Sequence, residues 1–245
     1  MRNVVSFTGN VLAIMIKELR TYFTSPLAYI TTAIFLLVSG FLFVIVVNAQ
    51  QNATMAARDL GFNIGIVMLF FAPALTMRLI AEEKRVGTIE MLLTAPVRDT
   101  EVVIGKFLGA LTLLIAMLAL TLYYPLFLTF LGDPDRGGLI ALYGGLVLLG
   151  GLFIAIGLFA SSLTQNQVVA AVFCFVLLLI FWIGSSAGPF LPTGLSDIVK
   201  YLGVIEHFVD FTKGIVSIDH VVYYITGIIL FLFLTIRSLE SRTWL

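Results

Sequence analysis

Long apolar stretches without charge alternate with short polar segments along the whole chain. The uncharged stretches cover residues 21–57, 60–77, 107–132, 137–196 and 221–236. A helix needs roughly 20 apolar residues to cross the hydrocarbon core of a bilayer. The stretch 137–196 is too long for one crossing, and the polar run from Ser161 to Gln167 divides it. The pattern therefore predicts six membrane-spanning helices, at 27–47, 60–81, 107–131, 139–160, 168–188 and 221–236.

The segment 10–25, ahead of the first predicted span, has a different pattern. Its apolar residues recur at helical spacing, and Lys17 and Arg20 take the opposite face. Asn10 is expected to cap its start, and Ser25 followed by Pro26 is expected to end it. We expect an amphipathic helix that lies on the membrane surface as a strut or anchor, with a packed soluble helix as the alternative. Charges within its apolar stretch make a cleavable signal peptide an unfavourable interpretation.

The connection at 189–220, between the fifth and sixth spans, is also amphipathic. Apolar residues from Leu195 to Phe211 repeat at a roughly helical period, with charged residues between them. This pattern predicts one or two short helices. Irregular backbone at membrane depth must be covered by protein, so we expect these helices to pack against the spans.

Composition agrees with a membrane protein and excludes several other classes. The chain has 245 residues, of which 60% are hydrophobic and 11% charged, far from the composition of soluble domains. Its net charge is zero, which disfavours nucleic acid as a partner. Cys174 is its single cysteine and cannot form an intrachain disulfide. The expected fold is one all-α, polytopic transmembrane domain over residues 1–245.

The distribution of basic residues predicts the orientation of this domain. Ten of the 14 Lys and Arg residues fall on the side that holds both chain ends. Basic residues are enriched in cytoplasmic loops, so both termini are expected in the cytoplasm, with the protein in the cell inner membrane.

The most highly charged segment is 78–106, between the second and third spans. Apolar residues from Val86 to Leu93 share one helical face, which predicts a short amphipathic helix ending at Thr94–Ala95–Pro96. Asp99 or Thr100 is expected to cap the next helix. Taken alone, this segment is equally well interpreted as a solvated loop with positive-inside charges.

Three motifs stand out: EEKRVGTIEMLLTAP at 82–96 followed by Gly105–Lys106, SSLTQNQ at 161–167, and the segment from His207 to Gly214. They resemble motifs of bacterial ABC-2 type permeases, most closely the gliding-motility and nitrous-oxide-reductase-maturation types. The resemblance implies a transporter subunit whose two inner loops dock onto two copies of a cytoplasmic ABC ATPase. It also implies a second permease subunit, identical or related, in the same lipid bilayer.

The resemblance assigns coupling roles to residues of both inner loops. The first coupling region comprises Glu82, Glu83, Lys84, Arg85, Gly87, Thr88, Glu90 and Pro96, and the second comprises Ser161, Asn166 and Gln167. Glu83 and Glu90 are expected to pair with basic residues of the ATPase, or with Lys84, Arg85 and Arg98 of their own loop. Gly87 would permit close backbone approach.

The energy source is expected to lie outside this chain. The uncharged stretches contain no Asp, Glu, Lys, Arg or His, which disfavours proton coupling. Gly105–Lys106 lacks the other residues of a P-loop, so ATP and Mg²⁺ are expected in the partner ATPase, with no cofactor bound here. These features predict a permease that exports an amphipathic or hydrophobic substrate.

Two alternatives to the permease remain open. A membrane anchor or mechanical transmitter would act on an extracytoplasmic partner without moving cargo. An intramembrane enzyme is less favoured, because His207, His220, Asp210 and Asp219 match no defensible metal-site spacing.

Overall fold

A computed structural model describes residues 2–50, 52–88, 97–132, 134–184 and 192–241, and every regular element in these ranges is a helix. The helices are α1 (Arg2–Thr24), α2 (Pro26–Ala49), α3 (Ala53–Thr76), α4 (Ala81–Val86), α6 (Asp99–Leu120), α7 (Tyr123–Leu131), α8 (Arg136–Leu163), α9 (Gln167–Ile183), α10 (Thr193–Leu202), α11 (Val204–Thr212) and α12 (Ile218–Glu240). The expected all-α class is therefore correct.

Each of the six predicted spans overlaps a helix in the part of the chain that the structure describes. Five helical segments are long and apolar enough to cross a membrane: Pro26–Ala49, Ala53–Val86, Asp99–Phe130, Arg136–Leu163 and Ile218–Glu240. Helix α9 is apolar but shorter than these five. The second segment begins before the predicted residue 60, because Asn52 accepts the Thr54 N–H and caps α3 there. The protein is thus a multi-pass membrane protein, and its number of crossings stays a prediction.

Helix α8 lies at the centre of the bundle. It contacts α3, α6, α9, α11 and α12. Close approach at these contacts depends on small residues: a Cβ atom added at Gly61 would overlap Leu142, and one added at Gly157 would overlap Thr76. Leu146, Phe153 and Ile156 of α8 are fully buried in the resulting core.

The outer surface of the bundle is apolar, as a lipid-facing surface should be. Large side chains such as Leu37, Phe41, Phe130, Ile140 and Ile180 are well exposed. In water such a surface would be costly, and in a bilayer it meets hydrocarbon. The alternation of buried and exposed apolar residues therefore reflects protein-facing and lipid-facing sides of each helix.

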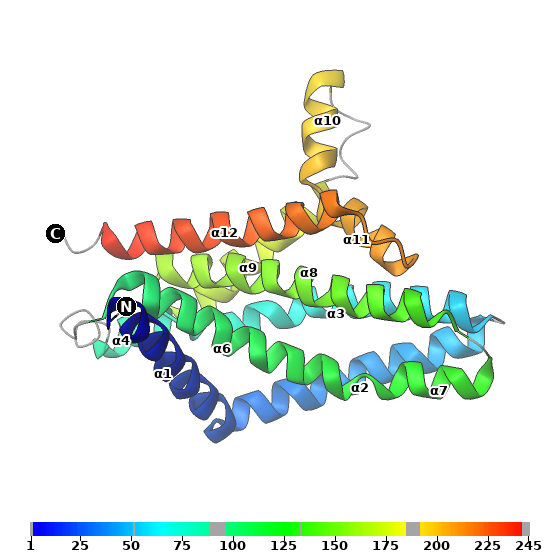
Figure 1. Ribbon diagram of the computed structural model, residues 1–245, viewed down its shortest axis with the longest axis horizontal. Helices are drawn as coiled ribbons and strands as arrows, with labels where there is room; N and C mark the ends of the chain where they lie inside the picture. The colour runs from blue at the N-terminus through cyan, green and yellow to red at the C-terminus, as the bar shows by residue number, and fades with distance from the viewer. Residues whose placement is uncertain (1, 51, 89–96, 133, 185–191, 242–245) are drawn as a thin grey trace.

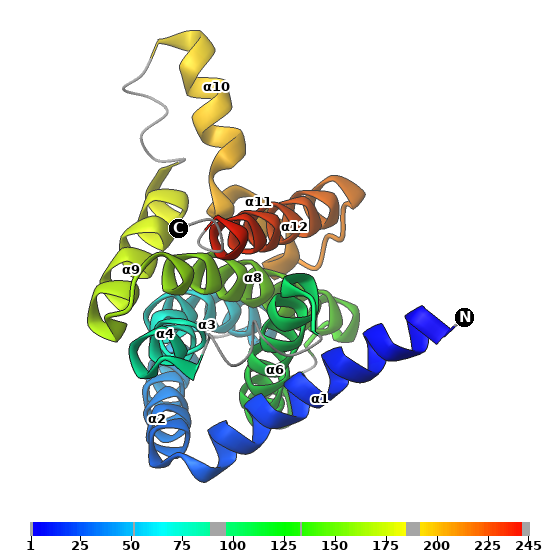
Figure 2. The ribbon, with the colours of Figure 1, turned by 90° about the vertical axis from the view of Figure 1, so that its left-hand side faces the viewer.

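Helices α1 and α10 depart from the direction of the other long helices. Helix α1 runs obliquely across one side of the bundle and packs against α6, whereas α10 projects away from the bundle (Figures 1 and 2). The start of α1, α4 and the last turn of α12 lie at one end of the bundle, and α7 and α11 lie toward the other (Figure 1). We call these the α4 end and the α11 end.

Several expected helix boundaries are corrected by the structure. Helix α1 begins at Arg2, so Asn10 lies inside it and does not cap its start. Its predicted end is right: Thr24 is its last residue, and Ser25 accepts the Leu27 N–H to cap α2, with Pro26 in the first turn. Neither Asp99 nor Thr100 caps α6; Arg98 holds that position.

The connection before α12 contains two short helices, α10 and α11, as the sequence predicts. Helix α11 contacts α8, α3 and α9. Val204, Phe208 and Phe211 are its buried anchors. The expectation that this segment packs against the spans is met by α11.

Candidate functional site

Helix α4 forms a short turn of helix where the chain leaves α3. It ends at Gly87, whose φ of 76° places it in the left-handed region that suits glycine. Thr88 follows, and its hydroxyl donates to the Glu83 carbonyl at 3.4 Å. Arg85, Gly87 and Thr88 are exposed. The segment 82–88 of the predicted coupling region therefore presents a solvent-facing tip at the α4 end of the bundle.

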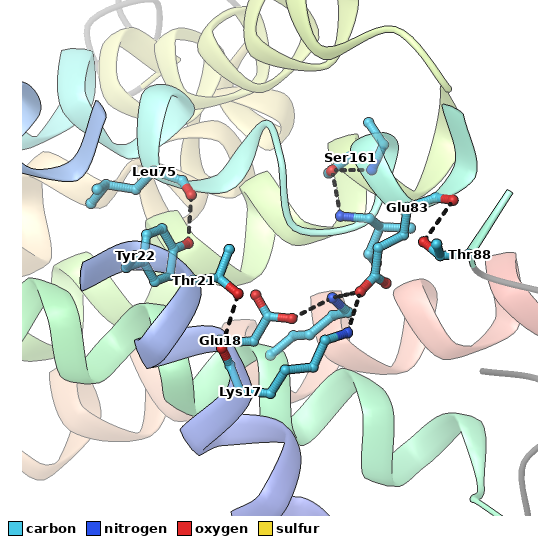
Figure 3. Close-up of polar contacts among 11 residues, drawn as sticks. Lys17, Glu18, Thr21, Tyr22, Leu75, Glu83, Thr88 and Ser161 are labelled. Atoms are coloured by element: carbon cyan, nitrogen blue, oxygen red, sulfur yellow. Dashed lines mark hydrogen bonds and ion pairs between the residues drawn. The ribbon is translucent and has the colours of Figure 1, made fainter. Parts of the chain in front are cut away.

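A cluster of four charged side chains fixes α4 to α1 and α6. Lys106 Nζ lies 2.7 Å from Glu18 Oε1 and 2.9 Å from Glu83 Oε1. Lys17 Nζ approaches the same Glu83 oxygen at 3.1 Å. Figure 3 shows Lys17, Glu18 and Glu83 converging from α1 and α4. We call Lys17, Glu18, Glu83 and Lys106 the ionic cluster.

Burial makes the ionic cluster a strong constraint. The side chains of Lys106, Glu18 and Glu83 are 2%, 9% and 14% exposed, whereas that of Lys17 is 57% exposed. Charges removed from water are stable only when they are paired with good geometry. Lys106 sits between two carboxylates, so loss of its charge would leave both facing each other. The geometry therefore ties α1, α4 and α6 to one cation.

Ser161 joins α4 to the second predicted coupling loop. Its buried hydroxyl oxygen accepts the N–H groups of Ile80 and Ala81 at 3.1 and 3.0 Å (Figure 3). It also donates to the Met77 carbonyl at 3.2 Å. The first N–H groups of a helix have no partner within the helix, so Ser161 supplies the acceptor that α4 needs. The end of α8 thereby caps the start of α4.

A second bond reinforces this connection, since the Lys84 ammonium donates to the Ser162 carbonyl. Lys84 and Ser162 are both buried. An ammonium group provides one of the last carbonyls of α8 with a partner, which suits the negative end of the helix dipole. Lys84 therefore points into the protein.

The junction between α1 and α2 is fastened to α3 on the same side. Arg78 donates through Nη1 to the Ser25 hydroxyl at 3.2 Å and lies 3.8 Å from Glu82. The Tyr22 hydroxyl donates to the Leu75 carbonyl at 2.8 Å (Figure 3). Burial, followed by the nearby Glu18 charge, raises the pKa of Tyr22 and keeps it protonated as a donor.

Glu101 strengthens the α1–α6 contact one turn from the ionic cluster. Its carboxylate accepts the Arg98 N–H at 3.0 Å and the Asn10 amide at 3.1 Å. The Glu101 carboxylate thus satisfies the backbone N–H of the N-cap residue Arg98, as the glutamate of a capping box does. Gly105 and Gly109 allow α1 to lie close, because Cβ atoms there would approach Ile14 and Glu18 within 2.8 Å. Polar and packing contacts together make α1 an integral part of the site.

The structure brings together some predicted coupling residues and separates others. Glu83, Lys84 and Ser161 face inward and hold α4 in place, while Glu82, Arg85, Gly87 and Thr88 form its outer side. Glu83 pairs with Lys17 and Lys106, two residues that the expected pairings did not include. Glu90 and Pro96 lie outside the described residues.

The remaining two predicted residues belong to the start of α9. Asn166 is exposed and accepts the Val168 N–H at 2.9 Å, which makes it the N-cap, and Gln167 is the first residue of the helix. Their local role is therefore to end the α8–α9 loop and begin the next helix.

Sequence reasoning did not identify Glu18, Lys106 and Glu101 as members of this site. Glu18 lies far along the chain from Glu101 and Lys106. Lys106 was noted as part of the Gly105–Lys106 motif and as a basic residue, and neither Glu18 nor Glu101 was assigned a role. The one available signal was their position in the helical pattern, since Glu18 falls near the apolar face of α1 and is 7% exposed. No metal site competes for these carboxylates, because the described part of the chain contains no suitable group of His, Cys, Asp and Glu.

Comparisons with known proteins identify relatives of this chain. The family model for the ABC-2 family transporter protein matches residues 12–239. A probable multidrug ABC transporter permease of Escherichia coli K12, YbhR, is 31% identical over 139 residues, which cover 56% of this chain and 37% of YbhR. A second, YbhS, is 35% identical over 113 residues, covering 43% of this chain and 28% of YbhS.

The chain thus aligns with well under two thirds of the length of either relative. The family model, by contrast, extends from the middle of α1 almost to the end of α12 and so includes the ionic cluster, α4 and the α8–α9 loop. On this match the chain belongs to the ABC-2 transporter family.

Proposed function

We propose that this chain is the membrane-embedded permease subunit of an ATP-driven ABC transporter. In this proposal the tip of α4 and the α8–α9 loop receive the movement of a cytoplasmic ATPase. The observation that carries it is the attachment of α4 to α8 through Ser161 and to α1 and α6 through Glu83.

These attachments would allow α4 to transmit a force from its tip to the rest of the bundle. A force on its exposed tip acts on α8 through buried hydrogen bonds, and on α1 and α6 through the buried Lys106 charge. Helix α8 in turn contacts most of the bundle. Tightly packed elements move as units between discrete arrangements, so a displacement of α4 would be transmitted to the spans.

The surface offered to the partner consists of Arg85, Gly87 and Thr88 at the tip of α4, together with Gln165 and Asn166 of the α8–α9 loop. All five are exposed. The two helices that flank this loop, α8 and α9, both contact α4. The ATPase would bind ATP and Mg²⁺. Two copies of the ATPase would lie beneath this chain and a second permease subunit, which is either identical or related. The excess of Lys and Arg at the α4 end supports placing that end, and both chain termini, in the cytoplasm.

Charge reversal at the tip tests the docking surface. Arg85→Glu should weaken recovery of the ABC ATPase that co-purifies with the unsubstituted chain, and should lower its permease-stimulated ATP hydrolysis. Arg237→Glu is the matched control, because Arg237 is exposed, basic and located in the last turn of α12. Equal recovery and turnover with Arg85→Glu and the unsubstituted chain would refute docking at α4, and absence of any co-purifying ABC ATPase would refute the permease itself.

The cargo is proposed to be amphipathic or hydrophobic and to be exported. A cavity of about 310 Å³ between α8, α9 and α12 supports this, since its lining includes Leu152, Ile156, Phe181 and Phe231. The naming of YbhR and YbhS as probable multidrug permeases points the same way. ATP-dependent movement of a lipophilic cationic dye in vesicles containing the purified complex tests the proposal, and a dye flux independent of ATP would oppose it.

A mechanical transmitter is the second candidate. Helix α10 projects from the bundle at a distance from the ionic cluster (Figure 1), which suits contact with an extracytoplasmic partner. Capture of such a partner by the unsubstituted chain, lost on removal of residues 193–202 while ATPase stimulation persists, would favour this function over transport.

A further inference from the structure

The two histidines of the chain meet near the α11 end of the bundle. His207 lies on α11 and His220 in the first turn of α12. Helix α11 is held in the bundle by buried Phe208 and Phe211, so the position of His207 is well defined. We call His207 and His220 the outer histidine pair.

All four ring nitrogens of this pair have a polar partner. The two Nδ1 atoms are 2.8 Å apart. His207 Nε2 lies 2.9 Å from the Tyr201 carbonyl oxygen, and His220 Nε2 lies 2.9 Å from an Asp210 carboxylate oxygen. The contacts form one continuous chain from α10 through α11 to α12.

These partners fix the number of protons on the pair. A carbonyl oxygen only accepts, so His207 Nε2 must carry a proton, and the ionised Asp210 requires a proton on His220 Nε2. Between the two Nδ1 atoms a hydrogen bond needs one donor and one acceptor. Three protons on four nitrogens satisfy every contact. The pair therefore carries a single positive charge.

The surroundings place this charge next to Asp210. Burial lowers the pKa of His207, and hydrogen bonds from Lys213 and His220 lower the pKa of Asp210. The geometry assigns the shared proton to His220, whose Nε2 faces the Asp210 carboxylate, and leaves His207 as the neutral ring. In this state His220 Nδ1 donates to His207 Nδ1.

We propose that the outer histidine pair is a pH-sensitive joint, closed by one shared proton and opened when acid adds a second. A proton on His207 Nδ1 would point at the proton of His220 Nδ1 across 2.8 Å, with two cations in contact. Like charges at this separation repel, and the hydrogen bond is lost. This inference does not depend on the proposed transport function.

Opening the joint would release α10 from α12. Beyond its bond to Tyr201, the His207 ring stacks on Tyr223, with ring centroids 3.9 Å apart. The Tyr223 hydroxyl donates to the Leu202 carbonyl at 2.7 Å. Displacement of the His207 ring thus disturbs both attachments at the end of α10.

Few other ionisable groups act on His207. Glu206 and Asp210 of its own helix and His220 of α12 are the charges that influence it, and the rings of Tyr201 and Tyr223 pack against it. Lys213 acts on Asp210. Helices α3, α8 and α9 also contact α11, but the described residues of these three helices supply no ionisable group that shifts the pKa of His207. The titration of the pair should consequently dominate the local response to acid.

Nitrogen-15 NMR of the unsubstituted protein in nanodiscs tests the proton count directly, because labelled histidine reports only these two residues. At neutral pH we expect one neutral ring protonated at Nε2 and one ring protonated on both nitrogens. The second protonation should occur below the ordinary imidazole pKa of about 6.5. Two neutral rings at neutral pH, or two independent titrations near the ordinary value, would overturn the proposal.

Distance measurement tests the mechanical consequence. Spin labels at Leu202→Cys and Ile218→Cys, in a Cys174→Ala background, report the separation of α10 from α12; both labelled positions are exposed. Titration from about pH 8 to about pH 4 should broaden and lengthen the distribution, with the closed fraction falling about tenfold per pH unit below the His207 pKa.

Two variants make the result specific. His207→Phe keeps an aromatic ring but accepts no proton, so its label distances should not change with pH. Arg136→Gln removes an exposed charge at the start of α8, leaves both imidazoles and Asp210 in place, and should keep the response. A pH-independent distribution in the labelled parent, or an unchanged response in His207→Phe, would refute the joint.

Discussion

Replacing the buried Lys106 by Met should destabilise the protein far more than the loss of a single surface charge. The ammonium group is 2% exposed and lies within 2.9 Å of two carboxylates, Glu18 and Glu83, which are themselves largely buried. Removing one partner of a buried ion pair leaves an uncompensated charge and costs about 3–5 kcal/mol. Here two carboxylates lose their shared cation, so we expect a cost at the upper end of that range.

The matched control is Lys17→Met, which makes the same chemical change in the same cluster. The Lys17 side chain is 57% exposed and its ammonium group pairs with Glu83 at the protein surface, so water can replace this contact. Exposed pairs contribute about 0.2–1 kcal/mol. The loss of unfolding free energy, measured by denaturant titration in mixed micelles, should therefore be several-fold larger for Lys106→Met than for Lys17→Met.

A third variant distinguishes charge from packing. Glu18→Gln and Glu83→Gln, introduced together into Lys106→Met, remove the two stranded charges and should recover much of the lost stability. Equal costs for Lys106→Met and Lys17→Met, or no recovery in the triple variant, would show that the buried charges do not hold α1, α4 and α6 together.

Three further predictions follow from individual groups. Gly87→Ala should cost roughly 1–2 kcal/mol of local stability, seen as faster amide hydrogen exchange in α4, because its φ is 76°; Gly144→Ala, which meets no neighbour, should not. Ser161→Ala should lower the free energy of unfolding by about 1–3 kcal/mol, because two buried N–H groups lose their acceptor, whereas Ser241→Ala at an exposed position should have little effect. Because the pKa of His207 is lowered, the unfolded chain takes up this proton at a higher pH than the folded chain. Thermal stability should therefore decrease as pH falls below about 6.5, and the decrease should shrink in His207→Phe. A stability that rises as pH falls below this value would contradict the last prediction.

The spanning helices could be predicted from the sequence because their cause is local. A helix must satisfy its own backbone hydrogen bonds in hydrocarbon and needs about 20 apolar residues to cross it. Each uncharged stretch therefore predicts a helix without reference to the rest of the chain. The end of α1 at Ser25–Pro26 and the amphipathic α10 and α11 followed from equally local signals. The cap of α6 did not, because Arg98 takes that position through its backbone and the Glu101 side chain.

The motif at 82–96 predicted a coupling region, yet the motif alone could not show which of its residues face into the protein. Four consecutive charged residues, Glu82 to Arg85, offer many pairings. Glu83 was expected to pair either with the ATPase or with a cation of its own loop. Its partners are Lys17 and Lys106, which lie on α1 and α6. Contacts between such distant segments depend on how the helices cross, and helical periodicity does not specify crossing.

The sequence by itself determined that this protein is a bundle of apolar helices with a charged segment at one end, because hydrophobic burial in lipid depends on residue type and spacing alone. Tertiary structure decided what the charges do. It buried Lys106 between two carboxylates, turned Ser161 toward the start of α4, and set His207 against His220. Ion pairs and hydrogen bonds act over a few ångströms, so their partners are known only once the helices are placed.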